Sequence, residues 1–117
     1  MRIEVRGRNV EVDEELRSRV IDRFRRVGRQ VSELATLEVV VWEERNPSIA
    51  DSQVAEATLR VKGVTLHAKE ASPSMGHTIH ELSEDISRQV KKHRDLRRKR
   101  YRTRQLVNRM RGRTAEA

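Results

Sequence analysis

The chain has 117 residues and a formal net charge of +8, and it contains no cysteine. Its length suits one domain with a modest core, and the lack of cysteine excludes disulfides, thiolate catalysis and cysteine-based metal sites. No apolar run approaches the roughly 18 residues that a membrane-spanning helix requires, so we expect a cytoplasmic protein with no membrane partner.

The positive charge is concentrated near the C-terminal end. Residues 1–90 hold 14 basic and 16 acidic side chains, whereas residues 91–117 hold 12 basic and 2 acidic ones. A cationic segment of this kind requires a counter-charge, and a polyanion such as nucleic acid is the natural partner. The competing interpretation is a solvated basic terminus without a partner.

The first two elements are predicted from alternation and from helical spacing. Alternating apolar residues indicate a strand over residues 2–6, followed by a turn at residues 7–9. Asp13 is a suitable N-cap for a helix that runs to about Val27, with Gly28 where helices commonly end. The inner face of this helix carries Leu16, Val20, Phe24 and Val27.

Three more strands are expected next. Residues 34–44 alternate and are rich in β-branched side chains, which is typical of a strand, and a polar loop with Pro47 follows. A hairpin is then expected, with strands over residues 53–61 and 64–68 joined at Lys62 and Gly63.

The last element is a helix that outlasts its own core. Ser72 followed by Pro73 is a helix-start signal. An apolar stripe then recurs at steps of four, three, four and four residues: Met75, Ile79, Leu82, Ile86 and Val90. Beyond Val90 the sequence stays basic and helical in character to about Arg104, although only Leu96 continues the apolar face. We therefore expect a cationic helix that overhangs its domain.

The element order is strand, helix, three strands, helix. A strand–helix–strand connection favours a parallel first pair, and hairpins make the other pairs antiparallel. We expect an α+β two-layer β-α-β-β-β-α sandwich, a four-stranded mixed sheet with two helices packed on one face. The domain would span residues 1–100, and residues 101–117 would be a basic, flexible C-terminal tail or the start of a linker.

RNA contact is expected through the helices rather than through the sheet. Trp42 is the one aromatic residue expected on the outer face of the sheet. A single aromatic side chain does not provide a platform on which RNA bases can stack. Arg19, Arg23 and Arg26 fall within about 60° of each other on the first helix. Alternatively, these three arginines only solvate an exposed edge and pair locally with Glu15 or Asp22.

No catalytic, metal or cofactor site is expected. His77 and His80 stand three residues apart beside Glu81, but no third ligand follows at a recognisable spacing. The five glycines are isolated, so there is no phosphate-cradling loop. We predict that the protein is not an enzyme and has no small-molecule substrate.

Three segments carry a resemblance to a known family: residues 7–12 (GRNVEV), residues 15–24, and residues 86–94 (ISRQVKKHR). Together they resemble the ribosome hibernation promoting factors, also called protein Y or ribosome-associated inhibitor, over about residues 1–100. The resemblance implies a domain that is similar to a double-stranded-RNA-binding domain and serves as a cytoplasmic stress or stationary-phase factor. Such a factor binds small-subunit ribosomal RNA at the decoding region of the ribosome and blocks messenger and transfer RNA binding, which inhibits translation.

The resemblance also implies partners and contact residues. The partners are the small ribosomal subunit and the whole ribosome, and dimerisation would require a further C-terminal domain in a longer form. By positional match it assigns RNA contacts to Arg8, Asn9, Arg23, Arg26, Arg88, Lys91, Lys92 and Arg94. The basic flank of the first helix and the overhang add Arg19, Arg97, Arg98 and Lys99.

Two points stay open at this stage. A general double-stranded RNA-binding or ribosome assembly protein would use the same basic helices. The chain also departs from the family where Gly76 follows Met75, a position at which relatives usually have a tyrosine.

Overall fold

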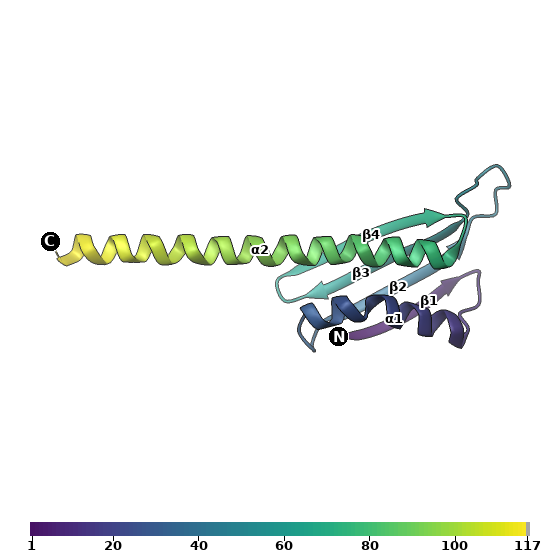
Figure 1. The fold of residues 1–117 in the computed structure, drawn as a ribbon, viewed down its shortest axis with the longest axis horizontal. Helices are drawn as coiled ribbons and strands as arrows, with labels where there is room; N and C mark the ends of the chain where they lie inside the picture. The colour runs from purple at the N-terminus through teal and green to yellow at the C-terminus, as the bar shows by residue number, and fades with distance from the viewer. Residues whose placement is uncertain (117) are drawn as a thin grey trace.

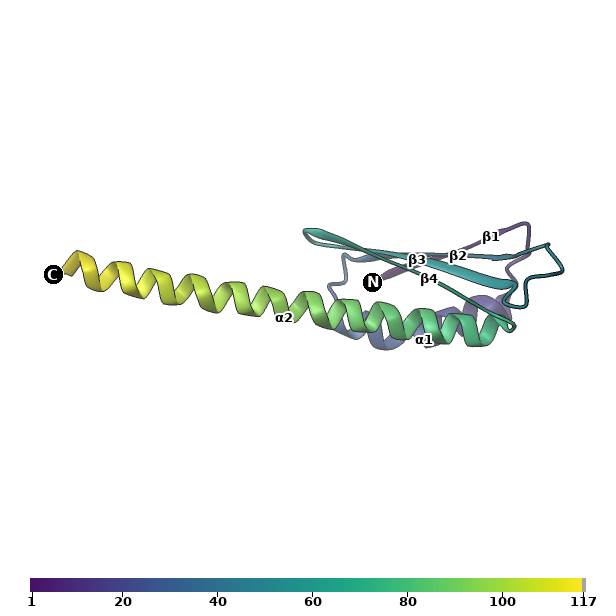
Figure 2. The ribbon, with the colours of Figure 1, turned by 90° about the horizontal axis from the view of Figure 1, so that it is seen from above.

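The computed structural model describes the backbone of residues 1–116 and the side chains of residues 1–110. The elements follow in the order β1 (Arg2–Arg8), α1 (Glu14–Gln30), β2 (Thr36–Glu43), β3 (Gln53–Val61), β4 (Val64–Ser72) and α2 (Met75–Glu116). The strands form one layer, and both helices lie on the same side of it (Figures 1 and 2). The predicted α+β sandwich is therefore confirmed.

The sheet is mixed, with the spatial order β1-β2-β3-β4. Strand β1 pairs with β2 in parallel, whereas β2–β3 and β3–β4 are antiparallel. The register places Val39 opposite both Val5 and Ala57, and Ala57 opposite Ala68. Since side chains alternate between the faces of a strand, this register gathers the apolar residues on the side of the helices.

The core lies between the sheet and the two helices. Phe24 of α1 and Leu82 and Ile86 of α2 are completely buried against it. Beneath them Ala55 and Ala57 are also fully buried, and these small side chains let helix α2 approach β3 closely. Close packing of this kind makes each core side chain matter to stability.

Helix α1 ends later than its sequence suggests. The expected stop at Gly28 is wrong, because the helix continues to Gln30 and Val31 is the first extended residue after it. Gly28 has no positive φ angle; a Cβ there would lie 3.5 Å from the Cε atom of Met1. Ordinary helical geometry at Gly28 thus gives the helix no reason to end.

Other element ends also differ from expectation. Strand β4 runs to Ser72 instead of residue 68, because it pairs with β3 up to the Gln53–Ser72 pair. Strand β1 continues through Gly7 and Arg8, because these residues pair with Val41 and Trp42 of β2. Helix α2 begins at Met75 rather than at Pro73. The strand pairing available at the sheet, and not local propensity, sets the two strand ends.

Helix α2 extends far beyond the sandwich. Within residues 1–110, Val90 is the last buried apolar residue of the helix. The helix nevertheless continues to Glu116, and the molecule measures 73 × 29 × 18 Å (Figure 1). The expected domain boundary at residue 100 falls inside this helix. The role of residues 101–116 as a tail or linker stays a prediction. Residue 117 lies outside the described residues.

Candidate nucleic-acid interface

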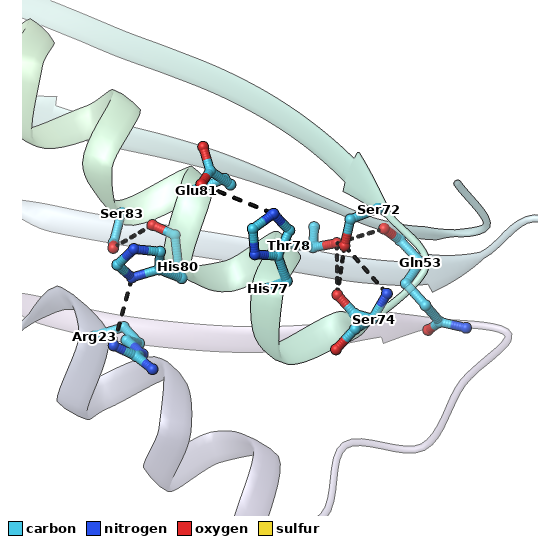
Figure 3. A network of polar contacts seen from close by, with 9 residues as sticks. All are labelled: Arg23, Gln53, Ser72, Ser74, His77, Thr78, His80, Glu81 and Ser83. Carbon is cyan, nitrogen blue, oxygen red and sulfur yellow. Dashed lines mark hydrogen bonds and ion pairs between the residues drawn. The ribbon is translucent and has the colours of Figure 1, made fainter. Parts of the chain in front are cut away.

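Helices α1 and α2 lie side by side and run in the same direction. A Cβ atom at Gly76 would lie 2.9 Å from Nη1 of Arg19, and Nη1 of Arg23 lies 3.4 Å from Nδ1 of His80 (Figure 3). Arg19 and Arg23 of α1 thus lie next to Gly76 and His80 of α2, and each pair is separated by four residues along its helix. The basic flank of α1 faces the first turns of α2.

Local ion pairs do not account for this basic flank of α1. Arg19 lies 3.6 Å from Glu15, but the glutamate is largely exposed, so the pair contributes little. Asp22 pairs with Arg25, outside the flank, at 2.9 Å. Arg23 and Arg26 are exposed, and their charge is available to a partner.

The start of α2 is held to the sheet by a buried hydroxyl network. Oγ1 of Thr78 lies 2.8 Å from the carbonyl oxygen of Gln53 on β3 and 2.6 Å from Oγ of Ser72 (Figure 3). The amide of Thr78 donates to the carbonyl oxygen of Ser74 at 2.9 Å, which is the first helical hydrogen bond. Because Thr78 is fully buried, these bonds fix the position of the start of α2 on the sheet.

The first half of α2 is acidic where it covers β4. Burial raises the pKa of Glu70 above its ordinary value of 4.5; a hydrogen bond with Asp85 and the charges of Asp85 and Glu81 act in the same direction, and Arg88 opposes them. Gln89 bridges this region by donating to Asp85 and to the carbonyl oxygen of His67, at 3.0 and 2.8 Å. The basic surface of α2 therefore begins only at Arg88.

From that point the structure divides the expected α2 cations between two faces. Four of them surround a shallow hollow on the exposed side of the helix, together with Asp95 and Leu96: Arg88, Lys91, Lys92 and Lys99. We call these four residues the outer cation face. The other three line a cavity at the end of the sandwich, next to Lys62: Arg94, Arg97 and Arg98.

The remaining expected contacts lie at the opposite end of the domain. Asn9, at the turn after β1, has a φ angle of 59°. The guanidinium carbon of Arg8 lies over the ring of Trp42, 4.8 Å from its centroid. Trp42 pairs with Val54 near the end of β2, and this is the end of the domain at which α2 starts. The fold therefore does not bring Arg8 and Asn9 together with the cavity cations.

Sequence reasoning missed several residues of this surface. Lys69 lies 5.4 Å from the Trp42 ring centroid, so the indole has cations from two strands close to it. Lys62 and Gln30 line the cavity beside α2. Alternation of β4 places Lys69 on the outer face, but the positions of Lys62 and Gln30 depend on packing between distant segments.

His77 and His80, in the first turns of α2, have protein partners. His77 lies 3.9 Å from Glu81, and His80 contacts Arg23 as described above. Within residues 1–110, no three His, Asp or Glu side chains gather closely enough to hold a metal ion. None of the helices in the described part of the chain is long and apolar enough to cross a membrane.

Comparison with known proteins decides the family. The sequence profile of the family "Sigma 54 modulation protein / S30EA ribosomal protein" matches residues 3–98. The chain belongs to this S30EA family. The profile covers the whole sandwich and the first part of α2, and helix α2 continues for a further 18 residues to Glu116.

Relatives in the S30EA family carry the name that the sequence resemblance suggested. The chain is 30% identical to the ribosome hibernation promoting factor of Salmonella typhimurium, over 81% of this chain and 95% of the relative. It is 24% identical to the factor of the same name from Acinetobacter guillouiae, over 82% of this chain and 89% of the relative. The resemblance is confirmed.

Solved structures of S30EA-like proteins share the fold. A ribosomal subunit interface protein from Coxiella burnetii superposes with a TM-score of 0.69 and 18% identity, over 81% of this chain and 99% of that one. The N-terminal domain of Thermus thermophilus Protein Y gives 0.68 and 22%, over 80% and 99%. These likenesses support the same sandwich architecture.

Proposed function

We propose that this protein is a ribosome hibernation factor of the cytoplasm. It binds small-subunit ribosomal RNA at the decoding region and blocks messenger and transfer RNA binding, thereby inhibiting translation under stress or in stationary phase. Membership of the S30EA family and relatives named ribosome hibernation promoting factor support the proposal.

The observation that carries the proposal is the basic overhang of α2. The helix loses its buried face after Val90 but stays helical to Glu116, and from residue 91 to residue 115 Asp95 is the only acid. A rod with this charge is attracted to RNA phosphates, whose neutralisation releases counterions. A rigid helix also keeps those charges at defined positions, which favours recognition of one RNA surface by shape.

The outer cation face and the flank of α1 form the proposed contact surface. Their residues are Arg88, Lys91, Lys92 and Lys99 on α2 and Arg19, Arg23 and Arg26 on α1. Arg8 and Asn9 contact RNA at a second point, at the other end of the domain. Two separated contacts orient an elongated molecule on a large partner better than one contact does.

Sedimentation tests the choice of partner. The protein is centrifuged with small subunits, with whole ribosomes and with naked duplex RNA at matched salt. A hibernation factor should pellet with small subunits much better than with an equal mass of duplex RNA, because only the assembled subunit has the required shape. Equal binding to duplex RNA would instead support a general double-stranded RNA-binding protein.

A competition experiment tests the site. Small subunits are pre-loaded with messenger and initiator transfer RNA before the protein is added to a purified translation system. We expect the pre-loaded RNAs to exclude the protein and to prevent inhibition. Undiminished inhibition on pre-loaded subunits would refute binding in the messenger and transfer RNA path.

A charge-reversal triplet tests the surface. Lys91→Glu, Lys92→Glu and Lys99→Glu together place like charge against phosphate and should abolish inhibition while leaving the core intact. The matched control reverses three exposed arginines elsewhere, Arg2, Arg45 and Arg60. Loss of inhibition in the control as well would show a general charge effect rather than a specific surface.

A further inference from the structure

A cavity of about 330 Å³ opens at the end of the sandwich from which α2 projects. Three segments that are distant in sequence form it: the end of α1, the β3–β4 turn and the part of α2 just after its last core residue. Four of its lining side chains are apolar: Val31, Val61, Leu66 and Val90. The cavity exists because the sheet and α1 end here while α2 continues.

The rest of the cavity lining is mainly cationic. It carries Lys62, Arg94, Arg97 and Arg98, and no acidic side chain is among the lining residues. Four positive charges around one hollow repel each other in the free protein, so an anion placed among them is stabilised. Arginine guanidinium groups in particular match the geometry of phosphate oxygens.

Unpaired polar atoms surround the same cavity. Oε1 of Gln30, Nε2 of His93 and Nε of Arg94 are buried and have no hydrogen-bond partner, and all three residues line the hollow. Burying such atoms without a partner costs free energy. Because these atoms are covered in the free protein, a ligand could hydrogen-bond to them only after the covering side chains move.

We propose that this cavity binds one nucleotide unit, with its base against the apolar wall and its phosphate among the cations. That this nucleotide would belong to RNA rests on the proposed function. Proteins commonly hold unstacked RNA bases on apolar or guanidinium surfaces. The cavity is within the volume range of small-ligand sites, at its lower end. The amide of Gln30 and the ring of His93 offer the donor and acceptor groups that base edges require.

Other ligand classes fit the cavity less well. An apolar ligand would leave four cations without a counter-charge, and a free phosphate ion would leave the wall of Val31, Val61, Leu66 and Val90 uncovered. A nucleotide satisfies both halves. It is supplied either by an unstacked residue of RNA or by a free mononucleotide, and the two sources share the same chemistry.

Methyl NMR of the full chain tests the proposal. AMP, GMP, CMP, UMP, inorganic phosphate and an unstructured RNA hexamer are titrated separately, and the methyl signals of Val31, Val61, Leu66 and Val90 are followed. We expect the hexamer, a mononucleotide or both to shift these signals, whereas phosphate alone at the same concentration leaves them unchanged. Binding by the hexamer alone identifies RNA as the source, binding by a mononucleotide alone identifies a free nucleotide, and binding by both shows that the cavity accepts either source.

Charge reversals in matched pairs separate the cavity from general attraction to the basic helix. Lys62→Glu with Arg97→Glu reverses two exposed cavity cations and should weaken binding by about tenfold or more. The control, Arg60→Glu with Arg102→Glu, reverses two charges at nearby exposed residues, on β3 and α2, that do not line the cavity. We expect the control to weaken binding by less than about threefold, through long-range charge alone.

Three results would overturn the inference. They are equal weakening by both pairs, equal methyl shifts with phosphate and with nucleotides, and no methyl shift with any nucleotide probe. Sedimentation of the same variants with small subunits keeps this test distinct from that of the proposed function. Wild-type protein that binds nucleotides in the cavity but does not pellet with small subunits would refute the proposed function and leave the cavity assignment standing.

Discussion

The guanidinium of Arg23 on α1 contacts the ring of His80 on α2, with 3.4 Å between Nη1 and Nδ1. These residues are 57 positions apart in the sequence. Their contact shows that the basic flank of α1 and the first turns of α2 are on the same side of the molecule. We expect the two helices to present their cations to one partner.

Reversal of this flank should impair ribosome binding. Arg23→Glu with Arg26→Glu should weaken sedimentation with small subunits in the same direction as reversals on the outer cation face, because both helices face the same RNA in the proposed complex. Arg17→Glu with Arg25→Glu is the matched control, since these arginines are exposed on other sides of α1. A control that weakens binding as strongly as the test pair would contradict the arrangement.

Core and cationic residues of α2 should differ sharply in their effect on stability. Leu82→Ala and Ile86→Ala each remove a fully buried aliphatic side chain, so we expect a loss of about 2–4 kcal/mol in the free energy of unfolding. Lys91→Ala and Lys92→Ala alter exposed side chains and should change it by less than about 0.5 kcal/mol. Urea unfolding measures all four, and equal losses in both pairs would refute the assigned core face.

Stability should depend on the protonation of Glu70. The folded state raises the pKa of this carboxyl through burial and through Asp85 and Glu81. The folded protein therefore holds more protons than the unfolded chain between the unfolded and folded pKa values, and stability falls as pH rises through that interval. Above it, the ionised Glu70 disfavours folding.

The variant Glu70→Gln removes this titration and keeps a donor for Asp85. We expect its melting temperature to exceed that of the wild type at about pH 7, with a smaller difference at about pH 4, where Glu70 is largely protonated in both states. Glu43→Gln, at the exposed end of β2, serves as control and should shift neither temperature. If the melting temperature of the Glu70→Gln variant exceeds that of the wild type by the same amount at both pH values, stability does not depend on the protonation of Glu70.

Two glycines should respond in opposite ways to alanine. At Gly7 a Cβ atom would overlap the carbonyl oxygen of Val10, which belongs to the backbone of a tight turn. We expect Gly7→Ala to destabilise the domain by about 1–3 kcal/mol. At Gly76 the nearest atom is Nη1 of Arg19, at 2.9 Å, on the free end of a flexible side chain.

Gly76→Ala should therefore be tolerated and should gain helix propensity, with a stabilisation of up to about 1 kcal/mol. Thermal melts of the two single variants measure both effects. Substantial destabilisation by Gly76→Ala would show that the approach of Arg19 to this glycine is required for the packing of α1 against α2.

Binding to small subunits should weaken steeply with salt. If about six to eight phosphates are neutralised, the logarithm of the affinity should fall with the logarithm of salt concentration at a slope of about −4 to −7. Sedimentation over a series of potassium chloride concentrations measures the slope. A value shallower than about −2 would mean that backbone contacts do not dominate.

Local pattern was sufficient for most of the fold. Alternation in residues 34–44 and 53–61 and the stripe from Met75 to Val90 predicted the strands and the core face of α2, because one buried face requires period 2 in a strand and 3.6 in a helix. It failed at element ends. Gly28 suggested a stop, but the helix runs to Gln30, and the chain turns toward β2 from Val31.

The candidate surface was predictable in composition and not in arrangement. A run of cations after Val90 indicated a polyanion partner, and the resemblance of residues 7–12 and 86–94 to hibernation factors indicated which one. Neither showed that Arg94 and Arg97 turn toward Lys62 while Lys91 and Lys92 face outward. Sequence spacing gives angles around one helix, but it does not say which other segments lie beside each angle.

The sequence by itself determined the sandwich, the length of its buried stripe and the excess of positive charge beyond it, because hydrophobic periodicity and net charge are properties of the chain alone. Only the tertiary structure decided that α1 and α2 run side by side, that Arg8 lies over Trp42 at the far end, and that Gln30, Lys62 and His93 meet around one cavity. These contacts join residues separated by tens of positions, and they arise because packing the sheet against both helices leaves one arrangement that buries the apolar faces together.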